Sequence, residues 1–300
     1  MPTVCVIGDI MLDVVTALES FDWTEVRDLK HCWNKIDLLP GGTGAMFAIA
    51  AAEVGFEAVR LIGKIGADRE TVDIAAQLAL DRLRALGIDV HVASDCENPT
   101  GRVMVTYLST GERLLVAEAG ANGTFCSADI TPGMEQQVTG SDIVFVSGFA
   151  LVKDARAQAV TYLMEKAAQA GRLVVLDVVP HEIYKMMDRP TFLALTKPVH
   201  VVAVEVNTAK RLFFSGDASL PESGVPIRIV ADRVLDHYTA AILQPAPDYQ
   251  FTFDRRGLVE EGTTGADQLS PRELRGFSEG IIARLLLRHY ARFAEGAFRT

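Results

Sequence analysis

A carboxylate follows a short apolar run near the N-terminus, in a place that suits the binding of hydroxyl groups. Val4–Gly8 is apolar and ends in Gly-Asp, a pattern typical of a buried parallel strand. Within Gly8–Asp13, the carboxylate of Asp13 lies close to the carboxyl end of that strand, where α/β proteins bind ligands. Its oxygens can accept hydrogen bonds from two hydroxyls. The alternative is that Asp13 only stabilises a turn.

A glycine-rich turn would complete such a site. Pro40–Ala45 reads Pro-Gly-Gly-Thr-Gly-Ala and leads into an alanine-rich helix that ends at Gly55. Adjacent glycines let the backbone approach a ligand, and their N–H groups would open the N-terminus of the helix. The alternative is a plain tight turn, because a lone glycine cluster is weak evidence.

The elements that must position these residues alternate along the chain. We expect strands over 58–63, 90–94, 142–147, 173–177 and 199–204, and helices over 69–86, 155–170, 190–195 and 208–214. This alternation predicts a parallel sheet with helices on both faces. The segments 103–108 and 113–117 predict a hairpin, which together with part of 12–40 would form a small β flap at the edge of the sheet.

The pattern weakens beyond residue 220. Ile227–Val230 predicts a strand, and Thr239–Leu243 with Tyr249–Phe253 predict a pair of strands. Ser270–Glu273 has the sequence of a capping box with proline at the first helical position, so we expect it to open a long helix that ends near Phe293.

The order of these motifs resembles the ribokinase-like (PfkB) family of carbohydrate and nucleoside kinases. The resemblance covers residues 3–214. It rests on Gly8–Asp13, Gly41–Ala45, Gly63–Asp68, Thr100-Gly101 before a hairpin, Gly120-Ala121-Asn122, Ser147-Gly148, and Asp177 with Pro180.

The resemblance implies an α/β fold, a Rossmann-like α/β/α sandwich with a mainly parallel sheet and a small β lid. Residues 1–300 would form one domain, with the lid built from about 12–40 and 100–118. Family members transfer the γ-phosphate of ATP to a hydroxymethyl group, with an Asp as base beside an anion hole at a helix N-terminus. The substrate-binding residues expected from the resemblance are Asp13, Gly41, Gly42, Thr43 and Met46.

The nucleotide-binding half departs from the family pattern. Met46 replaces a substrate-binding Asn, and a thioether is a poor acceptor for a hydroxyl. Glu205–Thr208 stands where the family has the Asn-x-x-Glu that organises Mg²⁺. Val230–Arg233 replaces a Thr-x-Gly turn under the ATP phosphates, and Gly262–Gln268 resembles Asp-Thr-x-Gly-Ala-Gly-Asp with one glycine missing and the leading Asp gone.

Two alignments of the terminal motif remain open. The first makes Asp267 the catalytic base, because the capping box follows it directly. The second matches Arg275–Gly280 to the family's Asp-Ala-Phe-x-Ala-Gly, which puts Arg275 in the base position and leaves no base. With the first alignment, the expected cofactor-binding residues are Glu205, Asp232, Thr264, Gly265 and Ala266. The expected cofactors are ATP and Mg, and no metal-ligand set is predicted.

The sequence therefore predicts an ATP-dependent phosphotransferase acting on a hydroxyl of a small sugar or nucleoside. The alternative is a sugar- or nucleotide-binding pseudokinase on the same fold. A Rossmann dehydrogenase is disfavoured, because Gly8 is followed by Asp-Ile-Met and not by Gly-x-Gly-x-x-Gly.

Composition narrows the partners and the compartment. The net charge of −10 disfavours nucleic acid, and the basic stretch Arg284–Arg292 lies on an apolar predicted helix. The four cysteines form no CxxC pair, so zinc is not expected, and scattered thiols fit a reducing compartment. No signal peptide or membrane span is predicted, so we expect a cytoplasmic protein. Phe21, Trp23 and Trp33 suggest a homodimer formed through the lid, and the alternative is that they pack onto their own domain.

Overall fold

The computed structural model describes residues 1–18, 34–68, 71–108, 113–214, 225–246, 249–263 and 276–298. The strands are β1 Val4–Ile7, β2 Met11–Leu18, β3 Asp37–Gly41, β4 Val59–Gly66, β5 Asp89–Asp95, β6 Gly101–Leu108, β7 Arg113–Glu118, β8 Ile143–Ser147, β9 Leu173–Asp177, β10 Val201–Glu205, β11 Ala240–Ala246, β12 Tyr249–Asp254 and β13 Gly257–Thr263. The helices are α1 Thr43–Val54, α2 Ile74–Ala85, α3 Pro132–Gly140, α4 Asp154–Gln169, α5 Arg189–Leu195, α6 Val206–Phe213, α7 Ile227–Leu235 and α8 Phe277–Phe298.

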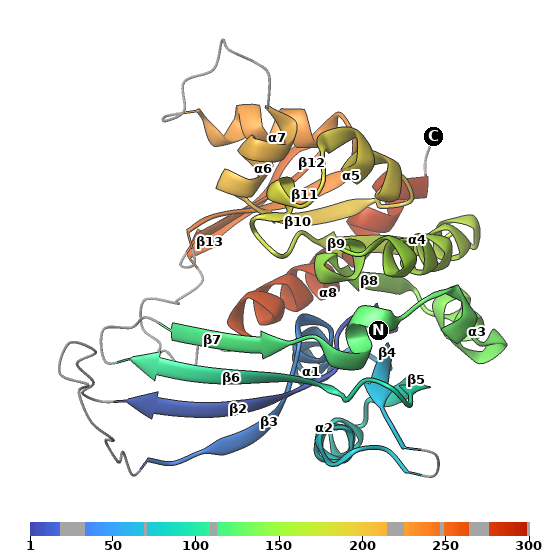
Figure 1. Cartoon of the computed structure of the whole chain (residues 1–300). Coiled ribbons are helices and arrows are strands. Elements are labelled where there is room, and N and C mark those ends of the chain that lie inside the picture. Colours follow the sequence, from blue (N-terminus) through green and yellow to red (C-terminus); the bar gives the residue numbers. More distant parts are fainter. Residues whose placement is uncertain are drawn as a thin grey trace.

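A nine-stranded sheet forms the centre of the molecule (Figure 1). Its order is β13-β12-β11-β10-β9-β8-β1-β4-β5, and the pairs from β11 through β5 are parallel, whereas β12 and β13 pair antiparallel. The parallel strands are short apolar runs covered on both faces by helices, as the alternation in the sequence predicts. The predicted α/β fold with a mainly parallel sheet is confirmed.

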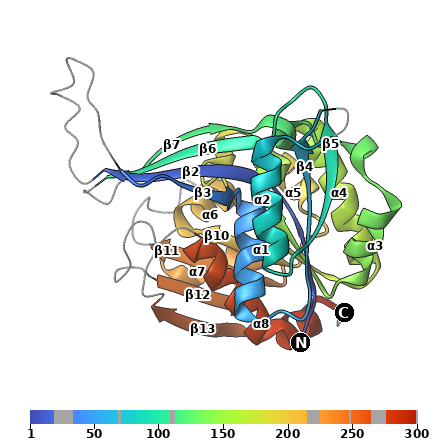
Figure 2. The ribbon, with the colours of Figure 1, turned by 90° about the horizontal axis from the view of Figure 1, so that it is seen from below.

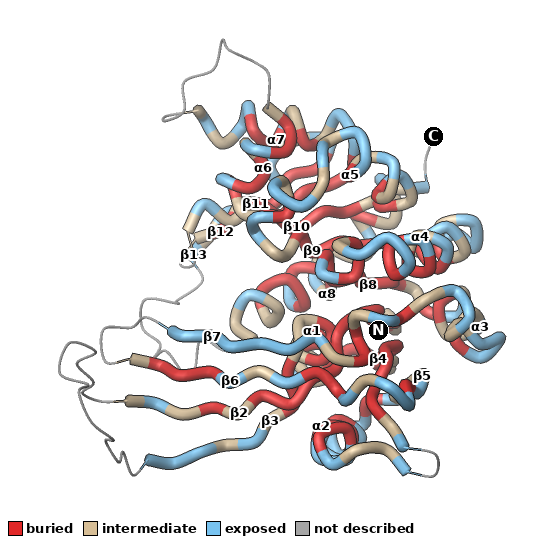
Figure 3. The backbone as a smooth tube through the Cα atoms, viewed as in Figure 1, coloured by how far each residue is buried: buried red, intermediate tan, exposed pale blue. Residues whose placement is uncertain are grey.

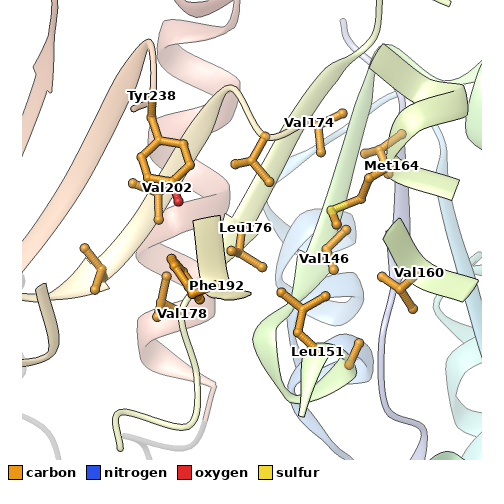
Figure 4. Packing of buried hydrophobic residues seen from close by; sticks show 14 of the residues in the cluster. Val146, Leu151, Val160, Met164, Val174, Leu176, Val178, Phe192, Val202 and Tyr238 are labelled. Atoms are coloured by element: carbon orange, nitrogen blue, oxygen red, sulfur yellow. The ribbon is translucent and has the colours of Figure 1, made fainter. Parts of the chain in front are cut away.

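Helices cover the two faces of the large sheet in separate groups. One face packs against α3 to α7, and Figure 4 shows part of that core, with Val146 of β8, Leu176 of β9 and Met164 of α4 in one cluster. The other face packs against α1, α2 and α8, and Figure 2 shows α1 and α2 side by side. Phe47 of α1 stacks on Phe145 of β8, with ring centroids 3.5 Å apart, so α1 lies directly over the middle of the sheet.

A second, four-stranded sheet of order β3-β2-β6-β7 projects from the N-terminal half (Figure 1). It contains the predicted hairpin, β6 with β7, and the predicted strands within 12–40, so the expected small β sheet is present. The chain enters this sheet twice by short connections: β2 begins four residues after β1 ends, and β6 begins at Gly101, six residues after β5 ends. The short connection from the end of β1 to the start of β2 therefore fixes where the two sheets meet.

Several sequence-based boundaries were wrong. Residues 227–230 are not a strand but the start of α7, whose buried Val230, Ala231 and Val234 have helical spacing. The helix expected over 69–86 begins at Ile74, because the side chain of Asp73 caps it by accepting from the Ala76 N–H at 2.8 Å. Helix α3 was not predicted.

Candidate active site

The carboxyl end of β1 touches the N-terminus of α1. A Cβ built on Gly8 would lie 2.8 Å from the Cα of Gly44, so both positions need the absence of a side chain. The chain then passes through Asp9 and Ile10 into β2 of the small sheet. The site therefore forms where the two sheets and α1 converge.

Asp13 lies against the glycine turn, as the sequence predicts. It is a residue of β2 itself rather than of the loop after β1, and only 7% of it is exposed. A Cβ on Gly41 would lie 1.7 Å from the Asp13 Oδ1, so the carboxylate covers the Cα of Gly41. Asp13, Gly41 and Gly42 are thus brought together, with Thr43 as the first residue of α1.

Gly42 opens α1 with a conformation that favours glycine. Its φ is 84°, and a Cβ there would lie 2.7 Å from the carbonyl oxygen of Asp9. No side chain caps the helix, and the Ala45 N–H donates to the Asp9 carbonyl at 3.1 Å. Gly42 itself offers no side chain to cap the helix, so the N-terminus of α1 suits a ligand hydroxyl or anion.

Two side chains from distant segments hold the Gly8–Ile10 segment in place. Arg156 of α4 donates to the Asp9 carboxylate at 2.5 Å, and both side chains are nearly buried. Asn122 bonds the backbone of Ile10 twice, with its Oδ1 accepting at 3.0 Å and its Nδ2 donating at 2.9 Å. The sequence marked Asn122 only as part of a motif match, and no sequence signal pointed to Arg156.

A buried ionic network adjoins these contacts of Asn122 and Arg156. Lys64 of β4 contacts Asp129 at 3.0 Å and Asp95 at 3.7 Å. Burial would raise the pKa of Asp95, but hydrogen bonds from Thr124 and from nearby backbone and Asn98 groups hold that pKa well below its usual range. A cavity of about 10 Å³ beside the network is lined in part by Lys64 and Arg156, and it has room for roughly one water molecule.

Met46 links α1 to the start of α8. A Cβ on Gly276 would lie 2.3 Å from the Met46 Cε, so the thioether packs on the backbone of Gly276. Helix α8 begins at Phe277, and Gly276 before it has a φ of 71°. The expectation of one continuous helix from Ser270 to about Phe293 was therefore wrong, because the left-handed conformation at Gly276 interrupts it.

The residues expected to carry out the chemistry lie outside the described residues. These are Asp267, Thr264, Gly265, Ala266 and the alternative base-position residue Arg275. The first alignment relied on a helix that begins at Ser270, whereas the second places the start of the helix where α8 begins. Glu279 in the first turn of α8 is described, and sequence reasoning assigned it no role beyond its place in the second alignment.

The carboxyl end of β10 carries Glu205. Its carboxylate lies 3.7 Å from the His181 Nδ1 and 3.4 Å from the Thr208 hydroxyl, which itself donates to the His181 carbonyl at 2.6 Å. Across the described segments, no three His, Cys, Asp or Glu side chains are grouped so as to hold a metal ion. Glu205 is thus held by His181 and Thr208 and belongs to no cluster of metal ligands among the described residues.

Val230–Arg233 is not a turn under a phosphate site. These residues belong to α7, and Asp232 is exposed there, paired with Arg228 at 3.1 Å. The strand that follows β10 in the sheet is β11, and its register partner for Glu205 is Gln244. Gln244 therefore stands at the carboxyl end where the sequence analysis had placed Val230–Arg233.

Two further polar groups lie at the ends of β8 and β9. Ser147 is fully buried, and Asp177 is 8% exposed. Burial, reinforced by the Glu279 carboxylate, raises the pKa of Asp177 well above its ordinary value. The sequence matched both residues to the family without giving either a role.

Comparison with known proteins decides the family. The model of the pfkB family carbohydrate kinases matches residues 1–216, more than half of the chain. The chain belongs to the PfkB family. That match spans the PfkB motifs at Gly8, Gly41–Gly44 and Asp177, and it ends just after α6. No curated protein sequence matches the chain significantly.

Solved structures similar to this PfkB chain include sugar and nucleoside kinases. Adenosine kinase from Trypanosoma brucei brucei has a TM-score of 0.76 at 16% identity, covering 99% of this chain and 96% of that one. A putative ribokinase II from E. coli has a TM-score of 0.73 at 17% identity, covering 98% and 89%. Fructokinase from Halothermothrix orenii has 0.70 at 17%, covering 98% and 96%. At these identities the likeness establishes the fold.

The helices that the structure describes include none long and apolar enough to cross a membrane.

Proposed function

We propose that this PfkB chain binds a small sugar or nucleoside at Asp13, Gly41 and Gly42, and that it is a pseudokinase without phosphotransfer activity. The observation that carries the proposal is the start of α8 at Phe277, with Gly276 packed on Met46. This start favours the alignment that gives Arg275 the base position. A guanidinium stays protonated at neutral pH and cannot accept the proton of a hydroxyl.

The acidic groups in the part of the fold where a nucleotide is expected to bind support the same proposal. Phosphoryl transfer depends on positive charge and N–H donors around the transferring phosphate. The carboxyl ends of β9 and β10 instead present Asp177 and Glu205, and Glu279 stands in the first turn of α8. The carboxylates of Glu205 and Glu279 at these places disfavour a triphosphate.

The second candidate is an ATP-dependent kinase of a small sugar or nucleoside, and membership of the PfkB family favours it. In that case Asp267 is the base, Thr264, Gly265 and Ala266 hold the transferring phosphate, and Glu205 attracts Mg²⁺ that accompanies ATP. Asp232 contributes nothing in that scheme, because it faces Arg228 on the outside of α7.

One experiment separates the two candidates. Thermal unfolding is followed with a panel of sugars and nucleosides, with and without Mg-ATP, and ADP formation is measured in the same samples. We expect hydroxylated ligands to raise Tm, Asp13→Ala to abolish that shift, and no ADP to form above background. Ligand-dependent ADP formation that Asp267→Asn removes would establish the kinase instead.

A homodimer through the small sheet is proposed on a described surface. Leu38, Val14, Met104 and Val116 stand in register across all four strands on one face. Three of them are more than 40% exposed, and β7 is exposed along its length (Figure 3). An apolar row of this kind fits a second copy of the same sheet. Phe21, Trp23 and Trp33, on which the sequence argument rested, lie outside the described residues.

We place the protein in the cytoplasm. The three cysteines of the described segments are free thiols, which fits a reducing compartment.

A further inference from the structure

Ser147 and Asp177 are neighbours at the carboxyl edge of the large sheet. Ser147 ends β8 and Asp177 ends β9, and the two residues are register partners in this parallel pair. Side chains of register partners point to the same face of a sheet. The hydroxyl and the carboxyl therefore stand side by side.

Both groups face the helix layer that holds the ligand-binding turn. Phe145, two residues before Ser147 on the same face, stacks on Phe47 of α1. Val175, two residues before Asp177, belongs to the core shared with α1 and α8. A Cβ on Gly8 would lie 3.3 Å from the Ser147 Cβ, so Ser147 adjoins the end of β1, where the Gly42–Gly44 turn packs.

Neither group has its hydrogen-bonding capacity used within the described protein. The Ser147 hydroxyl is fully buried and has no partner there. The Asp177 carboxyl, nine-tenths buried, receives no side-chain or backbone hydrogen bond from the residues that the structure places. Buried polar groups without partners destabilise a fold, so such a pair is expected to meet a ligand or water.

Charge selects among the possible ligands. Among the described residues, Glu279 is the charged group whose field acts on Asp177, and it has the same sign, so these two carboxyl groups disfavour an anion such as a phosphate. No metal-binding group of three acids or histidines occurs in the described segments. An ionised Asp177 needs a counter-charge, which none of the described residues supplies, and an ammonium group brings both that charge and the hydrogen-bond donors.

We propose that Ser147 and Asp177 form a second wall of the ligand site and bind a protonated amino group, so that the ligand is an amino sugar or an amine-bearing nucleoside. This inference rests on the proposed function, because it assigns the ligand of the same site. The Asp177 carboxylate accepts from the ammonium, and the Ser147 oxygen accepts a second N–H. Asp13 and the Gly41–Gly42 turn bind the hydroxyls of the same molecule.

Two sets of probes test the preference for an amine: one set consists of sugars and the other of adenosine derivatives. The first is D-glucose, D-glucosamine and D-glucose 6-phosphate, and the second is adenosine, 5′-amino-5′-deoxyadenosine and AMP. Affinities are measured by calorimetry and thermal shift at neutral pH. In at least one set we expect the amine to bind about tenfold tighter than its hydroxyl parent, and the phosphate to bind more weakly than either.

Variants separate recognition of the amino group from binding of the rest of the ligand. Asp177→Asn keeps the shape of the side chain, so it should abolish the preference for the amine while the parent still binds. Ser147→Ala should reduce that preference by a smaller factor, and Asp81→Asn, an exposed residue of α2, serves as control.

Each result has one consequence. Equal binding of amine and parent, or a preference that survives Asp177→Asn, overturns this inference and leaves the proposed function standing. Binding that survives Asp13→Ala overturns the proposed site. If none of the six probes binds, both are wrong.

Discussion

The terminal methyl group of Met46 rests on the backbone of Gly276, at the point where α8 begins. A Cβ at Gly276 would lie 2.3 Å from that methyl group. The contact joins α1, which follows the Gly41–Gly42 turn, to the start of α8. Two elements that lie far apart in the chain are therefore coupled by an apolar contact.

Gly276→Ala should destabilise the protein by about 1–2 kcal/mol, because a non-glycine residue at a φ of 71° is strained. Urea unfolding measures the change. In the double variant with Met46→Ala, only the part of the lost stability that comes from the steric contact should be recovered. Gly296→Ala, within α8 and with nothing within 4 Å, is the control and should leave stability unchanged or increase it. If both glycine variants behave alike, Gly276 is not strained.

Arg156→Ala should cost about 3–5 kcal/mol, because it leaves the Asp9 carboxylate buried without its partner. The same loss should weaken ligand binding, since Asp9 lies under Gly42. The control is Arg102→Ala, which breaks an exposed ion pair with Glu118 and should change stability by less than about 1 kcal/mol. Equal effects of the two substitutions in urea would refute the structural role of Arg156.

Asp177→Asn should stabilise the free protein at pH 7 and do so less at pH 4. The folded-state pKa of Asp177 is raised above 3.8, so the neutral acid is favoured in the fold. Its stability is fully present below pH 3.8 and is lost as the pH rises through the raised pKa, because the carboxylate must then be buried. Substitution removes this loss.

Tm measured from pH 4 to pH 8 for Asp177→Asn and wild type checks the sign. Asp95→Asn is the matched opposite case: hydrogen bonds lower the pKa of Asp95, so this substitution should destabilise at pH 7. A difference for Asp177→Asn that shrinks as the pH rises would contradict the assignment.

The sequence predicted those parts of the fold that local patterns determine. Apolar strands that alternate with amphipathic helices predict the parallel sheet, and the glycines at 41–44 predict the turn against Asp13. The run Ile227–Val230 failed because four apolar-rich residues fit a strand or a helix equally well. The capping box at Ser270 failed to locate α8, because a local pattern carries no information about the contact between Met46 and Gly276.

The order of the strands in the sheet was harder to predict than the individual strands and helices. Ser147 and Asp177 end adjacent strands, and Ser147 adjoins Gly8 only because β8 pairs with β1, from which it is separated by β2 to β7 in the chain. Arg156 lies on α4, which follows β8, and it reaches Asp9 because of the same pairing of β8 with β1. Tertiary pairing of this kind, and not propensity, brings these residues to one edge.

Met104→Glu should convert a dimer into a monomer. Met104 lies in the middle of the apolar row of the small sheet, between Val14 and Val116, and is 46% exposed in the single chain. Two such faces packed together would bury the row, and a carboxylate at its centre would lose its water without gaining a partner. Light scattering at high micromolar concentration should give twice the chain mass for the wild type and the chain mass for Met104→Glu. Met186→Glu is the control, because Met186 is 53% exposed away from this sheet and should leave the dimer intact. A wild-type protein that is monomeric at that concentration rules out this interface, and a dimer that survives Met104→Glu places the contact elsewhere on the molecule.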